Sequence, residues 1–304
     1  MNDAMTTAAH PVHLVGAGPG DPELLTLKAL RVLRQASVIL VDDLVGEQVL
    51  AAALDGLGAP PRVVRVGKRG GCASTPQEFI EKLMVREALA GERVVRLKGG
   101  DPLVFGRAGE EIAALRAAGI DVEIVNGITS GLAAAGSAGI GWTDRRAGAQ
   151  GVLLVTGHAG QGCEEPDWDA IARVAAAGVT LVVYMGVARA EAIVERLRTA
   201  LPGELPVAIV QRATGADEVI ARTTLGGLVD TIRTEAIASP AILVIGRVAA
   251  EARVPVRLPE DVHSAHPTNW GRGPAVLTLR GLGRWDRGLG AEENHVAGAD
   301  SLRR

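Results

Sequence analysis

The sequence is poor in aromatic residues and in cysteine. Aromatic side chains make up 2% of the 304 residues, whereas hydrophobic residues as a whole make up 47%. The core must therefore be built from Ala, Val, Leu and Ile, a composition that suits parallel strands covered by helices on both faces. Cys72 and Cys163 share no metal-ligand spacing and are too few for a disulfide framework. We expect a reducing compartment and no metal site.

Long apolar runs and a strong net charge are also missing. No run approaches the roughly 18 residues needed to span a bilayer, and residues 1–11 lack the charged-then-apolar order of a signal peptide. These absences predict a soluble cytoplasmic protein that does not bind membranes. The net charge of −3 argues against a general nucleic-acid binder. Residues 62–107 nevertheless hold ten Lys and Arg against five Asp and Glu.

Short β-branched runs alternate with helical patterns along most of the chain. This rhythm predicts an α/β fold with a parallel, wound sheet. We expect an N-terminal extension (1–11), two α/β domains (12–126 and 127–248) and a mostly disordered tail (249–304). The expected strands are 12–15, 38–41, 63–66, 94–97, 122–125, 152–156, 179–185, 206–210, 219–224 and 241–248, and strand 219–224 is a candidate for antiparallel pairing. The expected helices are about 24–34, 77–90, 109–118, 127–139 and 190–200.

Two helix starts carry capping signals. Asp21 is a suitable N-cap, with Pro22 as the first helical residue. Thr75, followed three residues later by Glu78, reads as a capping box that opens the helix running to about residue 90.

The loop after strand 94–97 reads Gly99-Gly100-Asp101-Pro102. Two glycines without Cβ atoms let a ligand lie against bare backbone. Open α/β sheets bind ligands at the carboxyl ends of their strands, where this loop stands. The same residues would also make a plain tight turn, so the loop alone does not decide.

The first glycine loop argues against a dinucleotide-binding site. Gly16 and Gly18 follow a strand, but Asp21 occupies the third glycine position of the dinucleotide fingerprint. A carboxylate there would repel a pyrophosphate, and Pro19 removes one N–H donor.

His158, at the end of strand 152–156, suits a structural loop as well as catalysis.

Eight motifs follow one another along residues 12–248. They are Gly16-Ala17-Gly18-Pro19-Gly20-Asp21-Pro22-Glu23-Leu24-Leu25-Thr26, Gly67-Lys68-Arg69, Ser74-Thr75-Pro76-Gln77-Glu78, Val94-Val95-Arg96-Leu97-Lys98-Gly99-Gly100-Asp101-Pro102, Gly106-Arg107, Gly127-Ile128-Thr129-Ser130, Val155-Thr156-Gly157-His158 and Tyr184-Met185-Gly186. Together they resemble the signatures of the tetrapyrrole methylases.

The resemblance implies two α/β domains of the tetrapyrrole methylase type, with S-adenosylmethionine in the cleft between them, usually in a homodimer. It implies transfer of two methyl groups to uroporphyrinogen III, giving precorrin-2 on the way to sirohaem or cobalamin. Asp42 is implied as proton acceptor and Lys68 as proton donor. The residues implied to touch the cofactor are Pro19, Gly99, Gly100, Asp101, Val104, Thr129, Ser130, Met185 and Ala213.

The residues are chemically compatible with this reaction. The sulfonium methyl is already activated, so the enzyme mainly aligns carbon, methyl and sulfur. A carboxylate such as Asp42 can then remove a proton, although a turn-forming acid would look the same. The substrate carries eight carboxylates, so basic side chains can equally act as charge-assisted clamps. These candidates are Lys68, Arg69, Arg96, Lys98, Arg107, Arg145 and Arg146.

Several positions depart from the family pattern. Asp43 stands where the family usually has arginine, which reverses a charge beside Asp42, and Asn126 replaces a proline before Gly127. These changes affect substrate handling more than cofactor binding. Three hypotheses stay open: a working methyltransferase on uroporphyrinogen III, a related precorrin methyltransferase, and a catalytically weak paralogue that binds tetrapyrrole or cofactor.

Overall fold

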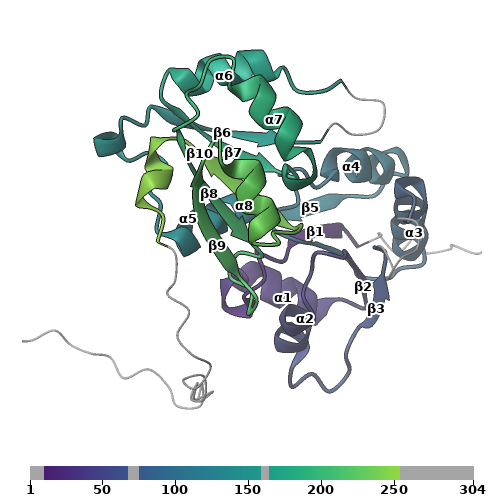
Figure 1. The fold of residues 1–304 in the computed structure, drawn as a ribbon. Coiled ribbons are helices and arrows are strands. Elements are labelled where there is room, and N and C mark those ends of the chain that lie inside the picture. The colour runs from purple at the N-terminus through teal and green to yellow at the C-terminus, as the bar shows by residue number, and fades with distance from the viewer. Residues whose placement is uncertain (1–9, 68–74, 159–163, 254–304) are drawn as a thin grey trace, which may run out of the picture. The chain divides into compact units, whose positions relative to one another are not determined.

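The computed structural model describes residues 10–67, 75–158 and 164–253. They contain two five-stranded sheets (Figure 1). All neighbouring strands of the first sheet run parallel, in the order β3-β2-β4-β1-β5, as predicted. Its strands are β1 (Val12–Gly16), β2 (Val38–Val41), β3 (Arg62–Arg65), β4 (Val94–Lys98) and β5 (Val122–Val125).

Helices cover both faces of the first sheet, because alternate strand residues point to opposite sides. Val15 and Ile39 pack against α1 and α2, whereas Leu14 and Leu40 pack against α3 and α4. The aliphatic composition therefore serves two separate apolar layers. The helices are α1 (Leu27–Gln35), α2 (Glu47–Leu54), α3 (Gln77–Leu89) and α4 (Ala108–Ala117).

The second sheet is mixed rather than wholly parallel. Its order is β6-β7-β10-β8-β9; β10 runs antiparallel to both β7 and β8. Strand β9 is antiparallel to β8, as predicted, and β6 is parallel to β7. The strands are β6 (Gly151–Thr156), β7 (Val179–Tyr184), β8 (Pro206–Gln211), β9 (Val219–Thr224) and β10 (Ala241–Ile245).

One face of the second sheet is covered by α6 (Trp168–Ala176), α7 (Ala190–Leu197) and α8 (Leu228–Thr234). The other face packs against α5 (Ser130–Ala138), the predicted small-residue helix. A Cβ on Gly131 would lie 2.4 Å from the Tyr184 hydroxyl, so only glycine allows α5 to approach β7 this closely.

Both predicted helix starts differ in detail. Asp21 caps a short 3-10 helix (Pro22–Leu24), and the Thr26 side chain caps α1 by accepting from the Ala29 amide at 3.1 Å. The capping box at Thr75 is wrong: in the described residues α3 starts after Pro76 with no side-chain cap, and the Thr75 hydroxyl donates to the Gly67 carbonyl at 3.2 Å. The hydroxyl is thus bonded to a backbone carbonyl eight residues earlier and does not cap the helix.

The packed chain continues beyond the predicted boundary at residue 248. Ala249 and Ala252 are buried, and the Arg253 amide donates to the Ala138 carbonyl at 2.9 Å. Residues 249–253 therefore belong to the folded part. The remaining predicted tail, most of the N-terminal extension, Lys68, Arg69, Cys72 and Cys163 lie outside the described residues. None of the described helices has the length and apolar character needed to cross a membrane.

Candidate active site

The carboxyl ends of several strands border one cavity. Strands β1, β2 and β4 end at the same edge of the first sheet because they are parallel. Strands β7 and β8 end at an edge of the second sheet where β10 begins. A cavity of about 750 Å³ lies between these edges. Its lining residues are Gly18, Pro19, Leu44, Gly99, Gly100, Ser130, His158, Tyr184, Met185, Ala188, Arg189, Val210, Arg212, Ala213, Ser239, Pro240, Ala241 and Ile242.

Glycine backbone forms the wall at the first sheet. The Gly100 amide donates to the Gly18 carbonyl at 2.8 Å, and the Gly18 amide donates to the Gly100 carbonyl at 3.2 Å. The φ angle is +71° at Gly18 and +66° at Gly100, values that glycine adopts without strain. A Cβ on Gly16 or Gly127 would lie 2.6 or 2.3 Å from the Gly100 carbonyl oxygen. This wall therefore presents backbone rather than side chains to the cavity.

Asp101 ties the loop after β4 to the loop after β5. Its Oδ2 accepts from the Asn126 side-chain amide and the Gly127 backbone amide, both at 3.1 Å. Its Oδ1 accepts from the Leu103 amide at 2.8 Å. Asp101 is 8% exposed, so these three donors replace the water that its carboxylate loses on burial. The Asn126 side chain supplies a donor that a proline at this position would lack.

Tyr184 forms the opposite wall. Its hydroxyl lies 2.8 Å from the Thr129 hydroxyl and accepts from the Gly131 amide at 3.0 Å, so β7 is tied to the start of α5. Burial raises the pKa of Tyr184, against the effect of these hydrogen bonds. The centroid of the Phe105 ring, from the loop after β4, lies 4.9 Å from that of the Tyr184 ring.

The loop after β8 meets the first glycine loop. The Asp21 amide donates to the Thr214 hydroxyl at 3.2 Å, and the Thr214 amide donates to the Glu218 carboxylate at 2.6 Å. Met185, Arg212 and Thr214 all have positive φ, between +47° and +66°. Non-glycine residues in this conformation cluster at ligand sites, where the surrounding structure holds them.

Asp42 stands just past β2 and two residues before Leu44, which lines the cavity. Its amide donates to the Leu97 carbonyl at 3.0 Å, its Oδ1 accepts from the Asp43 amide at 2.9 Å, and its Oδ2 lies 3.9 Å from Arg96 Nη2. The side chain is 32% exposed, so it can reach a ligand while it contacts the protein. A Cβ on Gly67 would lie 1.6 Å from Oδ1 of Asp43, so only glycine leaves room for this carboxylate.

The family model for tetrapyrrole (corrin/porphyrin) methylases matches residues 11–229. The chain belongs to the tetrapyrrole methylase family. It is 52% identical, over 79% of this chain and 94% of the relative, to the uroporphyrinogen-III C-methyltransferase of Pseudomonas aeruginosa.

Two solved methylases have the same fold. The uroporphyrin-III C-methyltransferase of Thermus thermophilus, complexed with S-adenosylhomocysteine, is 42% identical over 79% of this chain and 99% of its own, with a TM-score of 0.65. A cobalt precorrin-4 methyltransferase is 30% identical over 79% of this chain and 95% of its own, with a TM-score of 0.68.

Six of the nine residues that the methylase resemblance implies for the cofactor line the cavity. They are Pro19, Gly99, Gly100, Ser130, Met185 and Ala213. Asp101 and Thr129 hold the walls through the bonds described above, and the Val104 amide donates to the Asp101 carbonyl at 3.3 Å. The cavity volume is within the range of small-molecule sites, and the mixed backbone and apolar lining suits S-adenosylmethionine. Tyr184 lines the cavity as well, although the sequence analysis assigned it no separate role.

The predicted substrate clamps that lie within the described residues do not gather in one place. Arg96 and Lys98 are each 3% exposed, and both donate to the buried Glu111 carboxylate at 3.0 Å. This geometry corrects their expected role, because a cation buried on its own partner does not face a substrate. Arg107 is exposed and donates to Glu110 through two nitrogens, at 2.9 and 2.6 Å.

Arg145 is at the other end of the second sheet. It belongs to a 3-10 helix (Arg145–Ala147) that follows Trp142, whose carbonyl accepts from the Thr180 hydroxyl at 3.0 Å. Thr180 is near the start of β7, whereas Tyr184 at its end lines the cavity. The neighbouring Arg146 lowers the pKa of Asp144 to about 2 through hydrogen bonds. Within this chain, Arg145 is thus separated from the cavity by the length of β7.

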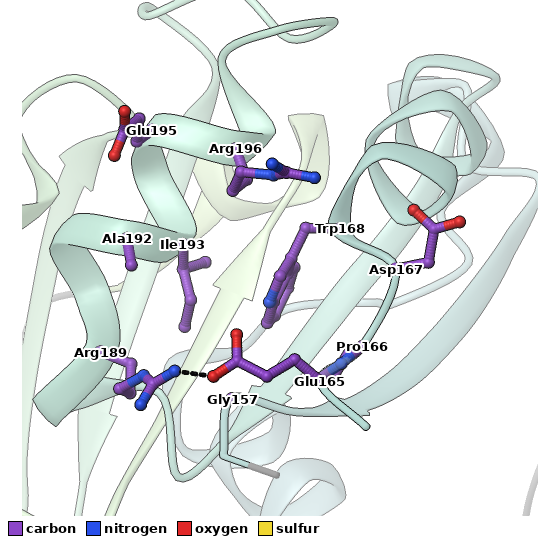
Figure 2. A pocket seen from close by; sticks show the side chains of 10 residues that line it. All are labelled: Gly157, Glu165, Pro166, Asp167, Trp168, Arg189, Ala192, Ile193, Glu195 and Arg196. Atoms are coloured by element: carbon purple, nitrogen blue, oxygen red, sulfur yellow. Dashed lines mark hydrogen bonds and ion pairs between the residues drawn. The ribbon is translucent and has the colours of Figure 1, made fainter. Parts of the chain in front are cut away.

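A second cavity, of about 490 Å³, lies between α6 and α7 (Figure 2). The Trp168 side chain lies between the two helices, and an ion pair joins Arg189 to Glu165. Arg196 pairs with Asp169 at 2.7 Å. Arg189 also lines the larger cavity, so the two spaces are neighbours.

Proposed function

We propose that this chain is a uroporphyrinogen-III C-methyltransferase, which transfers two methyl groups from S-adenosylmethionine to uroporphyrinogen III and forms precorrin-2. The observation that carries the proposal is the cavity between the sheet edges, with the Gly18–Gly100 wall on one side and Tyr184 on the other. The 52% identity to a uroporphyrinogen-III C-methyltransferase over 94% of its length supports the choice of substrate.

In this proposal the methyl donor is held mainly by backbone. Gly99 and Gly100 have no Cβ atoms, so the methyl donor can lie close against their backbone, and Met185 and Ala213 close the other side. Asp101 and Thr129 fix the two walls, so that the reacting atoms are aligned with little freedom. When bound, S-adenosylmethionine supplies a methyl group that its sulfonium centre has already activated.

Asp42 is the proposed base. A pyrrole ring carbon of the substrate forms the new carbon–carbon bond, the carbon–sulfur bond breaks, and S-adenosylhomocysteine leaves with the electron pair. A proton then passes from the methylated tetrapyrrole to the Asp42 carboxylate. The partial exposure of Asp42 and its neighbour Leu44, which lines the cavity, support this role. Lys68 stays the predicted proton donor.

Arg107, Arg69 and Arg145 stay predicted contacts of the substrate carboxylates. Arg107 is the described member of this set on the same loop as Phe105, whose ring contacts Tyr184 of the cavity wall. Its guanidinium already binds Glu110, so a substrate carboxylate would share or replace that partner. We also propose a homodimer, which size-exclusion chromatography with light scattering can test.

A related precorrin methyltransferase is the second candidate, because a cobalt precorrin-4 methyltransferase shares the fold with a TM-score of 0.68. Anaerobic incubation with uroporphyrinogen III and S-adenosylmethionine labelled in its methyl group separates the two. We expect label in the tetrapyrrole. Binding of S-adenosylhomocysteine without label transfer would contradict the first candidate and favour the second, or a binding protein without turnover.

A further inference from the structure

A cluster of buried charges lies below the carboxyl edge of the first sheet. Arg96 and Lys98 are 3% exposed and Glu111, from α4, is fully buried. Glu111 Oε1 accepts from Arg96 Nε and Lys98 Nζ, both at 3.0 Å, and from Gln77 Nε2 at 3.3 Å. Burying ions is costly unless partners compensate, so this cluster needs an explanation beyond stability.

The three ions do not balance one another. Arg96 and Lys98 bring two positive charges, whereas Glu111 brings one negative charge. Burial and the nearby Arg96 lower the pKa of Lys98, although Glu111 and Asp42 act in the opposite direction. Asp42 supplies the second carboxylate, with Oδ2 3.9 Å from Arg96 Nη2. The proposed base therefore completes the charge balance of the cluster.

The sheet fixes where these groups meet. Arg96 is paired in register with Leu40, and the Asp42 amide is bonded to the Leu97 carbonyl. Leu40 and Asp42 share one face of their strand, as Arg96 and Lys98 share one face of theirs. Arg96 Nη1 also lies 3.4 and 3.3 Å from the carbonyl oxygens of Leu40 and Leu97 and donates to both.

The guanidinium is thus held from three sides and turns Nη2 toward Asp42. At 3.9 Å this is a charge–charge contact rather than a direct hydrogen bond. It acts on a carboxylate that is anchored on its other oxygen by the Asp43 amide. Small errors in the position of a reacting group cost large factors in rate.

We propose that Arg96, held by Glu111, is a positioning residue that orients the Asp42 carboxylate for proton removal. The inference rests on the proposed function, with Asp42 as its base. Arg96 is buried and is not among the residues that line the cavity, so in this proposal it acts through Asp42, and its loss should matter only while Asp42 is a carboxylate.

A double-mutant cycle tests this dependence. We expect Arg96→Met to lower kcat for methyl transfer to uroporphyrinogen III about 10- to 100-fold, with unchanged S-adenosylhomocysteine affinity in calorimetry. In an Asp42→Asn background the same substitution should lower the residual single-turnover rate less than about twofold. Arg96→Lys should recover part of kcat. If Arg96→Met does not fold, the same cycle is run with Arg96→Lys, which keeps the buried charge.

A second buried carboxylate offers a matched control. Glu87, on α3, is 6% exposed and pairs with Arg62 and Arg86. Glu87→Gln and Glu111→Gln should both lower the melting temperature, but only Glu111→Gln should lower kcat. The inference would be overturned if Arg96→Met lowered the rate of methyl transfer by the same factor with and without the Asp42 carboxylate. Equal kcat losses in the two glutamine variants would overturn it as well.

The cycle also separates this inference from the proposed function. A wild-type protein that transfers no methyl group to uroporphyrinogen III would overturn both. Activity in the wild type that Asp42→Asn leaves unchanged would overturn the role of Asp42 and with it that of Arg96. If Asp42→Asn lowers the rate, and Arg96→Met lowers it by the same factor in both backgrounds, the role of Arg96 alone would be overturned.

Discussion

One oxygen of the Asp101 carboxylate accepts hydrogen bonds from the Asn126 side-chain amide and the Gly127 backbone amide, both at 3.1 Å. This contact joins the ends of β4 and β5, two strands on either side of β1. The shape of the glycine wall therefore depends on a carboxylate that is itself mostly hidden from solvent.

Replacing Asp101 by Asn should weaken both the fold and ligand binding. The new amide nitrogen would face either the Leu103 amide or the two donors from Asn126 and Gly127, and would leave buried N–H groups unpaired. We expect a loss of about 1–3 kcal/mol in the free energy of unfolding and weaker S-adenosylhomocysteine binding. Asn126→Ala removes one donor of three and should cost about 0.5–1.5 kcal/mol. Urea unfolding and calorimetry measure both; equal stability of Asp101→Asn and wild type would contradict the account.

The close approach of three backbone segments makes Gly16 irreplaceable. A Cβ there would lie 2.6 Å from both the Gly100 carbonyl oxygen and the Gly127 amide nitrogen. Gly16→Ala should therefore destabilise the protein by about 1–3 kcal/mol or more, because backbone must move.

Gly109 provides the control for this substitution. It lies in α4, and a Cβ there would meet nothing within 4 Å among the described atoms. Gly109→Ala should stabilise the protein by about 0.5–1 kcal/mol, since alanine favours helix. Thermal unfolding of the two variants should shift in opposite directions, and shifts of the same sign would refute the packing argument.

Tyr184 should make stability fall at alkaline pH. Its pKa is raised in the folded protein by burial, so above the ordinary value near 10 the unfolded chain loses this proton first. Deprotonation then favours unfolding, and stability falls as pH rises through that window. Tyr184→Phe should remove this part of the pH dependence, while it loses the bonds to Thr129 and Gly131 and is less stable at pH 7. Urea unfolding at pH 7 and above pH 10 measures the difference between the two proteins.

Asp43→Arg should act on the substrate and not on the methyl donor. The substitution restores the charge that is usual in the family beside the proposed base, and uroporphyrinogen III is polyanionic. We expect a lower KM for uroporphyrinogen III and an S-adenosylhomocysteine affinity within about twofold of the wild type. Steady-state kinetics at two salt concentrations provide the measurement, and an unchanged KM would mean that the departure is harmless.

Buried strands were predictable from sequence where they form continuous aliphatic runs, such as residues 38–41. The antiparallel placement of β10 was not predictable, because the sequence pattern of a buried central strand is the same in either direction. The capping box at Thr75 failed because the hydroxyl found the Gly67 carbonyl, a partner set by tertiary structure.

The site could be anticipated only in part. The glycine loop at Gly99 and Gly100 carries a local signal, since two adjacent glycines after a strand leave backbone open to a ligand, although the same residues also suit a tight turn. The pairing of Arg96 and Lys98 with Glu111 carries no such signal. It depends on which face of α4 packs on the sheet, and in the sequence those cations look like any basic residues near a loop.

The most direct test of the central claim counts the methyl groups that reach the tetrapyrrole. Uroporphyrinogen III and S-adenosylmethionine are incubated anaerobically with the protein, and the product is analysed by mass spectrometry. We expect a tetrapyrrole that carries two added methyl groups, together with a matching yield of S-adenosylhomocysteine. An unmodified tetrapyrrole, from protein that binds S-adenosylhomocysteine in calorimetry, would contradict it.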